Sequence, residues 1–262
     1  MDITGKIVVV TGGASGIGQA LCRRFAAEGA KSVIAADVDE EGARAVAREI
    51  RGVAARCDVR DEQDVIDLIE RTENEIGPID LFCSNAGIIA IGGVEVPNDE
   101  WQKIWEINVM AHVYVGRALI PRMIERGGGA LMITASAAGL LSQIGSAPYS
   151  VTKHAAVGLA ENIAITYGGQ GIQTFALCPQ AVRSNMTQQH EGGGVAAVDG
   201  LMEPEELADV VIQGLREETF LILPHPEVKT YMQRKAADYD RWIRGMQRLQ
   251  SRFLEGSPLK QR

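Results

Sequence analysis

The fold is decided by residues 7–18, which read IVVVTGGASGIG. The first half is a β-branched run typical of a buried strand, and the second half is a glycine-rich turn. Ile17, Leu21 and Phe25 then recur every four residues, which predicts a helix that ends near Gly29. This order predicts a phosphate-binding loop, because glycines let the backbone approach a pyrophosphate and the helix N-terminus offers free N–H groups. A glycine-rich turn without a ligand is the alternative.

The same alternation continues along the chain, which is the pattern of parallel βαβ units. Further strands are predicted over residues 32–36, 53–57, 79–84, 130–135, 172–178 and 220–223. Further helices are predicted over residues 40–50, around 65–69, and over 99–125, 147–167 and 204–215. We therefore predict an α/β fold, with a single doubly wound, Rossmann-like domain over residues 1–226 and an amphipathic helical extension over 227–262. The sheet is expected to be seven-stranded and mostly parallel.

The composition of the 262 residues excludes several classes of protein. Hydrophobic residues make up 46% and charged residues 23%, which rules out a disordered chain. The net charge of −8 argues against nucleic-acid binding. No apolar run reaches the ~18 residues of a membrane span, and the N-terminal run lacks the basic segment of a signal peptide. We expect a cytoplasmic protein that acts on a small molecule.

The cysteines carry no signal of a metal or redox site. Cys22, Cys57, Cys83 and Cys178 lie in or beside apolar runs, and no two form a CxxC pair. We interpret them as small buried thiols and expect no metal site.

Asp37 ends the second predicted strand, 19 residues after Gly18. A carboxylate there can bind both hydroxyls of an adenosine ribose and repels a 2′-phosphate. No Lys or Arg lies in the glycine-rich loop or directly after Asp37, so NAD is favoured over NADP. A helix N-cap is the alternative role, which Asp39 can fill instead.

Tyr149 and Lys153 are spaced i, i+4 on a predicted helix and therefore share a face. A lysine ammonium near a phenol lowers the pKa of the phenol, so Tyr149 is a candidate general acid/base. The spacing alone does not decide, since Tyr231 and Lys235 repeat it. The context favours the first pair, because Ser136 lies 13 residues earlier, at a strand end where parallel sheets bind ligands. A turn or cap role is the alternative for Ser136.

Together these motifs resemble the short-chain dehydrogenase/reductase (SDR) family over roughly residues 5–224. The resemblance rests on the glycine-rich loop, Asp37, Cys57-Asp58-Val59, Asn85-Ala86-Gly87, Asn108, Ser136, YSVTK at 149–153, and the region of Pro179. It implies an NAD-dependent alcohol dehydrogenase or ketoreductase that interconverts a secondary alcohol and a ketone. It also implies a homotetramer or a homodimer.

The resemblance implies a role for each catalytic residue. Ser136 would position the carbonyl or alcohol, and Tyr149 would donate or remove the proton. Lys153 would bind the nicotinamide ribose, and Asn108 would bend its helix and bind a water that touches Lys153. Interrupting the helix is the alternative role of Asn108. The implied cofactor-binding residues are Thr11, Gly12, Ser15, Gly16, Ile17, Gly18, Asp37, Asp58, Val59, Asn85, Ala86, Gly87, Tyr149, Lys153, Pro179, Val182 and Ser184. Asp58 and Val59 would hold the adenine.

One departure from the family pattern follows the sixth predicted strand, where Gln180 replaces the usual glycine after Pro179. A side chain here excludes backbone shapes that only glycine tolerates, or else it contacts the substrate. Ser184 keeps the hydroxyl of the usual threonine. A mostly apolar substrate pocket is expected near Ile89, Leu140, Leu141, Gln143, Ile144, Gln180, Met186 and His190.

Two other functions fit the same fold. A non-catalytic NAD-binding sensor or scaffold has no need of the four catalytic residues together. An NADPH-preferring ketone reductase is opposed by Asp37.

The C-terminal residues 227–262 carry nine Lys and Arg and four Asp and Glu. An apolar stripe is formed by Tyr239, Trp242, Met246, Leu249 and Phe253, beside a basic row of Arg244, Arg248 and Arg252. We expect the stripe to pack against the acidic body or a neighbouring subunit. Binding to an anionic membrane is the alternative, which we consider the weaker one.

Overall fold

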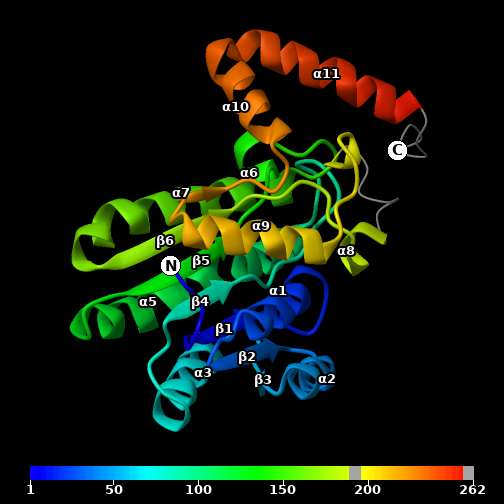
Figure 1. Ribbon diagram of the computed structural model, residues 1–262. Helices are drawn as coiled ribbons and strands as arrows, with labels where there is room; N and C mark the ends of the chain where they lie inside the picture. The colour runs from blue at the N-terminus through cyan, green and yellow to red at the C-terminus, as the bar shows by residue number, and fades with distance from the viewer. Residues whose placement is uncertain (189–195, 256–262) are drawn as a thin grey trace.

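One parallel sheet runs through the centre of the computed structural model, which describes residues 1–188 and 196–255 (Figure 1). The strands are β1 (Ile7–Thr11), β2 (Ser32–Asp37), β3 (Val53–Arg56), β4 (Leu81–Ser84), β5 (Gly129–Thr134), β6 (Ile172–Leu177) and β7 (Leu221–Ile222). Their order in the sheet is β3-β2-β1-β4-β5-β6-β7. The predicted α/β fold is confirmed, and all strand pairs described are parallel.

Helices cover both faces of this sheet (Figure 1). They are α1 (Gly16–Ala27), α2 (Glu40–Ile50), α3 (Glu62–Glu75), α4 (Asn98–Trp105), α5 (Ala111–Glu125), α6 (Ala138–Leu141), α7 (Ala147–Tyr167), α8 (Asn185–Gln188), α9 (Pro204–Arg216), α10 (Glu227–Ala237) and α11 (Tyr239–Glu255). Helices α3, α5 and α7 pack on one face, and α1, α2 and α9 pack on the other. No helix in the described part of the chain is long and apolar enough to span a bilayer.

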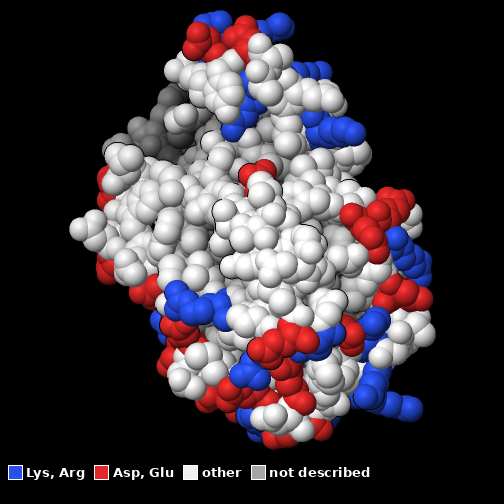
Figure 2. Space-filling view, turned by 90° about the vertical axis from the view of Figure 1, so that its left-hand side faces the viewer, with Lys and Arg blue, Asp and Glu red and all other residues white. Residues whose placement is uncertain are grey.

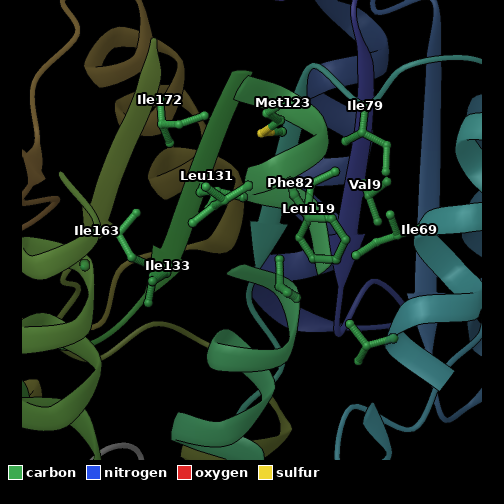
Figure 3. Packing of buried hydrophobic residues seen from close by; sticks show 14 of the residues in the cluster. Val9, Ile69, Ile79, Phe82, Leu119, Met123, Leu131, Ile133, Ile163 and Ile172 are labelled. Carbon is green, nitrogen blue, oxygen red and sulfur yellow. The ribbon is translucent and has the colours of Figure 1, made fainter. Parts of the chain in front are cut away.

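Two apolar layers hold the helices to the sheet. Along β1, Ile7 and Val9 face one layer, whereas Val8 and Val10 face the other, because side chains alternate along a strand. Both faces are buried, which explains why the strands read as continuous apolar runs. Figure 3 shows the layer beneath α3, α5 and α7, with Val9, Ile69, Phe82, Leu119, Leu131 and Ile163. All four cysteines are buried, as expected.

The helix predicted over 99–125 is interrupted. A π-helical segment, Glu106–Met110, separates α4 from α5, and Asn108 lies in its middle. The interruption expected at Asn108 is therefore present. Such single turns with i→i+5 bonds are often found at functional sites.

The C-terminal extension forms two helices, because Asp238 adopts an extended backbone between them. Helix α10 packs on α6 through Val228, and Trp242 of α11 joins this cluster. Tyr239 is 59% exposed, and Trp242, Met246 and Leu249 are partly buried, so the apolar stripe is only partly covered by the body. The side chain of Phe253 lies outside the described residues. Figure 2 shows Lys and Arg side chains on the extension, at the top of the molecule.

Candidate active site

Loops at the carboxyl ends of four neighbouring strands bring the expected site residues together. Strand β1 leads into the glycine-rich loop, β4 into residues 85–87, β5 into Ser136, and β6 into residues 179–184. These four strands are adjacent and parallel, so their loops meet at one edge of the sheet. The strand order reverses between β1 and β4, and the crevice at such a reversal is where doubly wound sheets bind ligands.

The glycine-rich loop is shaped by glycines at three positions. Gly12 and Gly16 have φ angles of +68° and +51°, in the left-handed region that favours glycine. A Cβ on Gly18 would lie 2.0 Å from the carbonyl oxygen of Gly12. A Cβ on Gly16 would lie 3.3 Å from Cβ of Ser184, so the loops after β1 and β6 face each other.

The N-terminus of α1 is prepared for an anion. Within the described residues, the N-cap Ser15 makes no side-chain capping hydrogen bond, and the first turn of the helix holds no acidic residue. The free N–H groups and the positive end of the helix dipole are therefore open to a phosphate. Together with the glycine cradle, this arrangement fits the pyrophosphate of a dinucleotide.

Thr11 ties the end of β1 to the segment after β4. Its Oγ1 accepts hydrogen bonds from the backbone N–H of Asn85, at 2.9 Å, and of Ala86, at 3.2 Å. The Asn85 amide donates in return to the Thr11 carbonyl oxygen, at 2.9 Å. The side chain of Asn85 thus holds the segment after β4 against the end of β1.

Asp37 presents its carboxylate at the end of β2. The backbone N–H of Ala14 donates to Oδ2 and that of Asp39 donates to Oδ1, each at 3.0 Å. Asp39 itself caps α2 by accepting a hydrogen bond from the N–H of Gly42. The capping role considered for Asp37 therefore belongs to Asp39, and the Asp37 carboxylate is fixed beside the glycine-rich loop.

Asp58 is paired with a neighbour that the sequence analysis did not consider. Nη2 of Arg60 lies 2.6 Å from its carboxylate, and this hydrogen bond holds the pKa of Asp58 below its usual value. Val59 packs against the apolar layer beneath α3.

Tyr149 lies in the first turn of α7, beside Ser136. Burial raises the pKa of the Tyr149 phenol, and the Ser136 hydroxyl opposes that rise. Nζ of Lys153 lies 5.7 Å from the centre of the tyrosine ring. The pKa of the phenol in the ligand-free protein is therefore raised, not lowered as expected, because desolvation of the phenolate outweighs the Ser136 hydrogen bond.

Ser136 is buried at the end of β5. Its hydroxyl accepts a hydrogen bond from the N–H of Ala138 at 3.0 Å and donates to the carbonyl oxygen of Pro179 at 3.4 Å. The first bond is the turn role left open above. The hydroxyl also lies beside the Tyr149 phenol, so the turn holds it where the two groups can bind one oxygen atom of a ligand.

Lys153 is the buried cation of the site, at 3% exposure. Its Nζ donates to the carbonyl oxygen of Thr134 at 2.8 Å. Burial lowers the pKa of Lys153 to about 8. A Cβ on Gly87 would lie 3.4 Å from both this Nζ and Oδ1 of Asn108, so only a small residue leaves the lysine accessible from the segment after β4.

Asn108 uses its side chain to hold the backbone after β4. Its Oδ1 accepts from the N–H of Ile88, and its Nδ2 donates to the carbonyl oxygen of Ile88, each at 2.9 Å. Nδ2 also lies 3.2 Å from Oγ1 of Thr152, in the turn before Lys153. Asn108 therefore joins three elements of the site, and its binding of a water stays a prediction.

The residues expected at the substrate lie in the loops after β5 and β6. Gln143 and Ile144 lie between α6 and α7, where the N–H of Gln143 donates to Oγ of Ser150 at 2.7 Å. In the loop after β6, Oγ1 of Thr187 donates to the carbonyl oxygen of Val182 and accepts from the N–H of Ser184. The expected residues Ile89, Leu140 and Met186 are partly buried, and Leu141 is buried. His190 lies outside the described residues.

A buried polar pair beneath Lys153 is absent from the sequence analysis. Nδ1 of His112, in the first turn of α5, lies 2.6 Å from Oγ of Ser84. Burial and the nearby Lys153 lower the pKa of His112 to about 3, so the imidazole is neutral. The signal available was its position four residues after Asn108, on the same helical face.

Comparisons with known proteins identify the family of the chain. The family model described as short chain dehydrogenase matches residues 6–193. The 1-deoxy-11-beta-hydroxypentalenate dehydrogenase of Streptomyces exfoliatus is 34% identical over 238 residues, which cover 87% of this chain and 86% of the relative. The 3beta-hydroxysteroid dehydrogenase 2 of Eggerthella lenta is 34% identical over 210 residues, covering 76% and 80%.

A solved structure extends the similarity to the whole fold. A short-chain dehydrogenase/reductase from Burkholderia phymatum, in complex with NAD, superposes with a TM-score of 0.84. It is 25% identical and covers 92% of this chain and 96% of its own. The chain belongs to the short-chain dehydrogenase/reductase family, and its activity is that of an oxidoreductase.

Proposed function

We propose that the protein is an NAD-dependent dehydrogenase that interconverts a secondary alcohol and a ketone, with Tyr149 as general acid/base. The observation that carries the proposal is the meeting of Ser136, Tyr149 and Lys153 at the sheet edge that also holds the glycine-rich loop. A sensor or scaffold would need the loop but not this polar cluster. Relatives named as dehydrogenases support the same choice.

The residues assigned to NAD are those that form the crevice. The glycine-rich loop and the N-terminus of α1 would bind the pyrophosphate, and Asp37 would bind the adenosine ribose. Asn85–Gly87 and Ser184 would flank the nicotinamide end, with Lys153 at its ribose. When bound, the nicotinamide supplies the acceptor or donor of the hydride. The NAD complex of the structural relative supports this choice of cofactor.

Proton transfer is assigned to the phenol of Tyr149. Ser136 donates a hydrogen bond to the substrate oxygen and orients it toward the phenol. The raised pKa of Tyr149 keeps the phenol protonated in the ligand-free protein, ready to donate in the direction of reduction. In the direction of oxidation the phenol must lose its proton first, and a cationic Lys153 then stabilises the phenolate.

The substrate that we assign is a secondary alcohol whose remaining surface is mostly apolar. Ile89, Leu140, Ile144 and Met186 are partly buried apolar side chains in the loops at this edge. The names of the two relatives, a hydroxysteroid and a hydroxypentalenate dehydrogenase, support a substrate of moderate size. A homo-oligomer and a cytoplasmic location remain predictions.

The test is a panel of secondary alcohols assayed with NAD and with NADP, following the absorbance of the reduced nicotinamide. We expect turnover of apolar cyclic alcohols with a higher kcat/KM for NAD. A preference for NADP would overturn the cofactor assignment. Tight NAD binding with no turnover of any alcohol or ketone would favour the sensor.

A further inference from the structure

Helix α10 is joined to the loop after β6 by hydrogen bonds through one carboxylate. The Tyr231 hydroxyl donates to Oδ1 of Asp199 at 2.9 Å. Nε2 of Gln180 donates to Oδ2 of the same residue at 3.1 Å. Asp199 thus uses one oxygen for the C-terminal extension and the other for the residue that follows Pro179.

Gln180 has a second anchor on its backbone. Its N–H donates to Nδ1 of His225 at 3.2 Å, in the segment between β7 and α10. His225 is 5% exposed, and burial lowers its pKa, which favours the neutral ring that can accept this bond. Both anchors of Gln180 therefore come from segments outside its own loop.

The position of Gln180 matters because its neighbour supports Ser136. The carbonyl oxygen of Pro179 accepts a hydrogen bond from the N–H of Ala137 at 2.8 Å and another from Oγ of Ser136 at 3.4 Å. A shift of Gln180 would carry Pro179 with it and change the wall against which Ser136 is held.

Helix α10 also contacts the opposite wall of the site. Val228 is fully buried against Ala137 and Leu141, in and before α6. Nζ of Lys235 donates to the carbonyl oxygen of Leu140 at 2.6 Å. The same helix thus touches the loop after β5 and, through Asp199, the loop after β6.

We propose that Tyr231 and Asp199 are positioning residues of the substrate site. They fix the position of Gln180 and thereby the shape of the pocket that binds the alcohol. The proposal rests on the proposed function. It assigns to the C-terminal extension a larger effect on the alcohol or ketone than on NAD, because the hydrogen bonds that link Tyr231 to Gln180 involve neither the glycine-rich loop nor Asp37.

The kinetic test compares Tyr231→Phe, Asp199→Ala and the double variant, in the full-length enzyme with NAD. We expect Tyr231→Phe to raise KM for the alcohol about 3- to 10-fold, the effect of one lost hydrogen bond, with kcat changed less than KM. Asp199→Ala should raise it further, and the double variant should equal Asp199→Ala, because both residues act through one carboxylate. The Kd of NAD, measured by calorimetry, should change less than KM for the alcohol.

The matched control is Tyr239→Phe, which removes a hydroxyl from the exposed first residue of α11 and should leave KM unchanged. Additive effects of the two variants would overturn the proposal. So would an unchanged KM in Tyr231→Phe, or a rise in the Kd of NAD as large as the rise in KM.

A second measurement needs no substrate. Amide hydrogen exchange over peptides that cover residues 179–188 and 196–202 should be faster in Tyr231→Phe, with the β1 peptide unchanged. Equal exchange of these peptides in wild type and variant would show that Tyr231 does not hold the loop after β6, and would overturn the proposal. A wild-type enzyme that turns over no alcohol would refute the proposed function. The hydrogen-exchange measurement would still show whether Tyr231 and Asp199 hold the loop after β6 in place.

Discussion

The two sides of the candidate site are held in different ways. On the side of the glycine-rich loop, the site is backbone fixed between a strand and a helix. On the side of the loop after β6, it is fixed by hydrogen bonds between side chains that are distant in the sequence. Gly12, Gly16 and Gly18 shape the first side within one strand–helix turn. Asp199 and Tyr231, which lie 32 residues apart, hold the second.

The difference follows from what each side has to bind. A pyrophosphate is bound by N–H groups of a fixed turn, so the turn has little freedom to change. A substrate is bound by side chains on loops, which can change without breaking the sheet. Substitutions on the first side should therefore change cofactor binding, and substitutions of Gln180 and its partners on the second side should mainly change KM for the alcohol.

The largest effect is expected where the two sides meet. Tyr149→Phe should lower kcat by about 10²- to 10⁴-fold, because it removes the proton carrier, and leave the Kd of NAD within a few-fold. Steady-state kinetics and calorimetry measure both. Tyr239→Phe is the control, because it removes the same hydroxyl from an exposed tyrosine outside the candidate site. A near-normal kcat would remove Tyr149 from the mechanism.

The cofactor side is tested at Asp37. Asp37→Ser should weaken NAD and improve NADP in relative terms, changing the ratio of their kcat/KM values by about 10- to 100-fold, the loss of hydrogen bonds to a charged group. The control is Asp39→Ser, which keeps a capping side chain on α2. If both variants shift the ratio equally, Asp37 does not choose the cofactor.

The buried His112, near Lys153, tests whether water is excluded from the protein interior at the site. Its pKa is about 3 in the folded protein and about 6.5 in the unfolded chain, so the unfolded state binds more protons as the pH falls below 6.5. Between pH 7 and pH 5 this group should cost about 2 kcal/mol of the free energy of unfolding. Urea unfolding of wild type and His112→Gln at both pH values isolates the contribution of His112 to the free energy of unfolding. Equal decreases of this free energy in the two proteins would contradict the prediction.

The substrate side should show the smallest effect. Gln180→Gly restores the residue usual in the family and removes the bond to Asp199. We expect KM for the alcohol to rise about threefold, with the Kd of NAD unchanged, because a single exposed hydrogen bond is lost. A change in NAD binding instead would break the division between the two sides.

Most of the fold was predictable because its signals are local. The seven strands and the strand–loop–helix start come from apolar periodicity and glycines, and both are confirmed. The π-helical break before α5 was expected only through the family resemblance. Asn108 in this segment bonds to Ile88, 20 residues away, and local periodicity does not reveal such a distant partner. The apolar stripe that begins at Tyr239 coincides with the start of α11, whereas the shorter helix α10 carries no comparable stripe in the sequence.

The chemistry of the site was predictable in its residues and less so in its energies. Ser136, Tyr149 and Lys153 meet as expected, but the direction of the Tyr149 pKa was wrong, because spacing on a helix does not reveal burial. The bond from Arg60 to Asp58 and the bonds of Asp199 depend on side-chain geometry, which no periodicity reports.

The central claim is tested most directly by a single turnover with saturating NAD and alcohol, in which the rate of NADH formation isolates the chemical step from binding. Our account predicts that Tyr149→Phe slows this step by about 10²- to 10⁴-fold, whereas Gln180→Gly leaves it near the wild-type rate. Equal rates in Tyr149→Phe and wild type would contradict the account, because the proton would then leave by a route that does not include Tyr149.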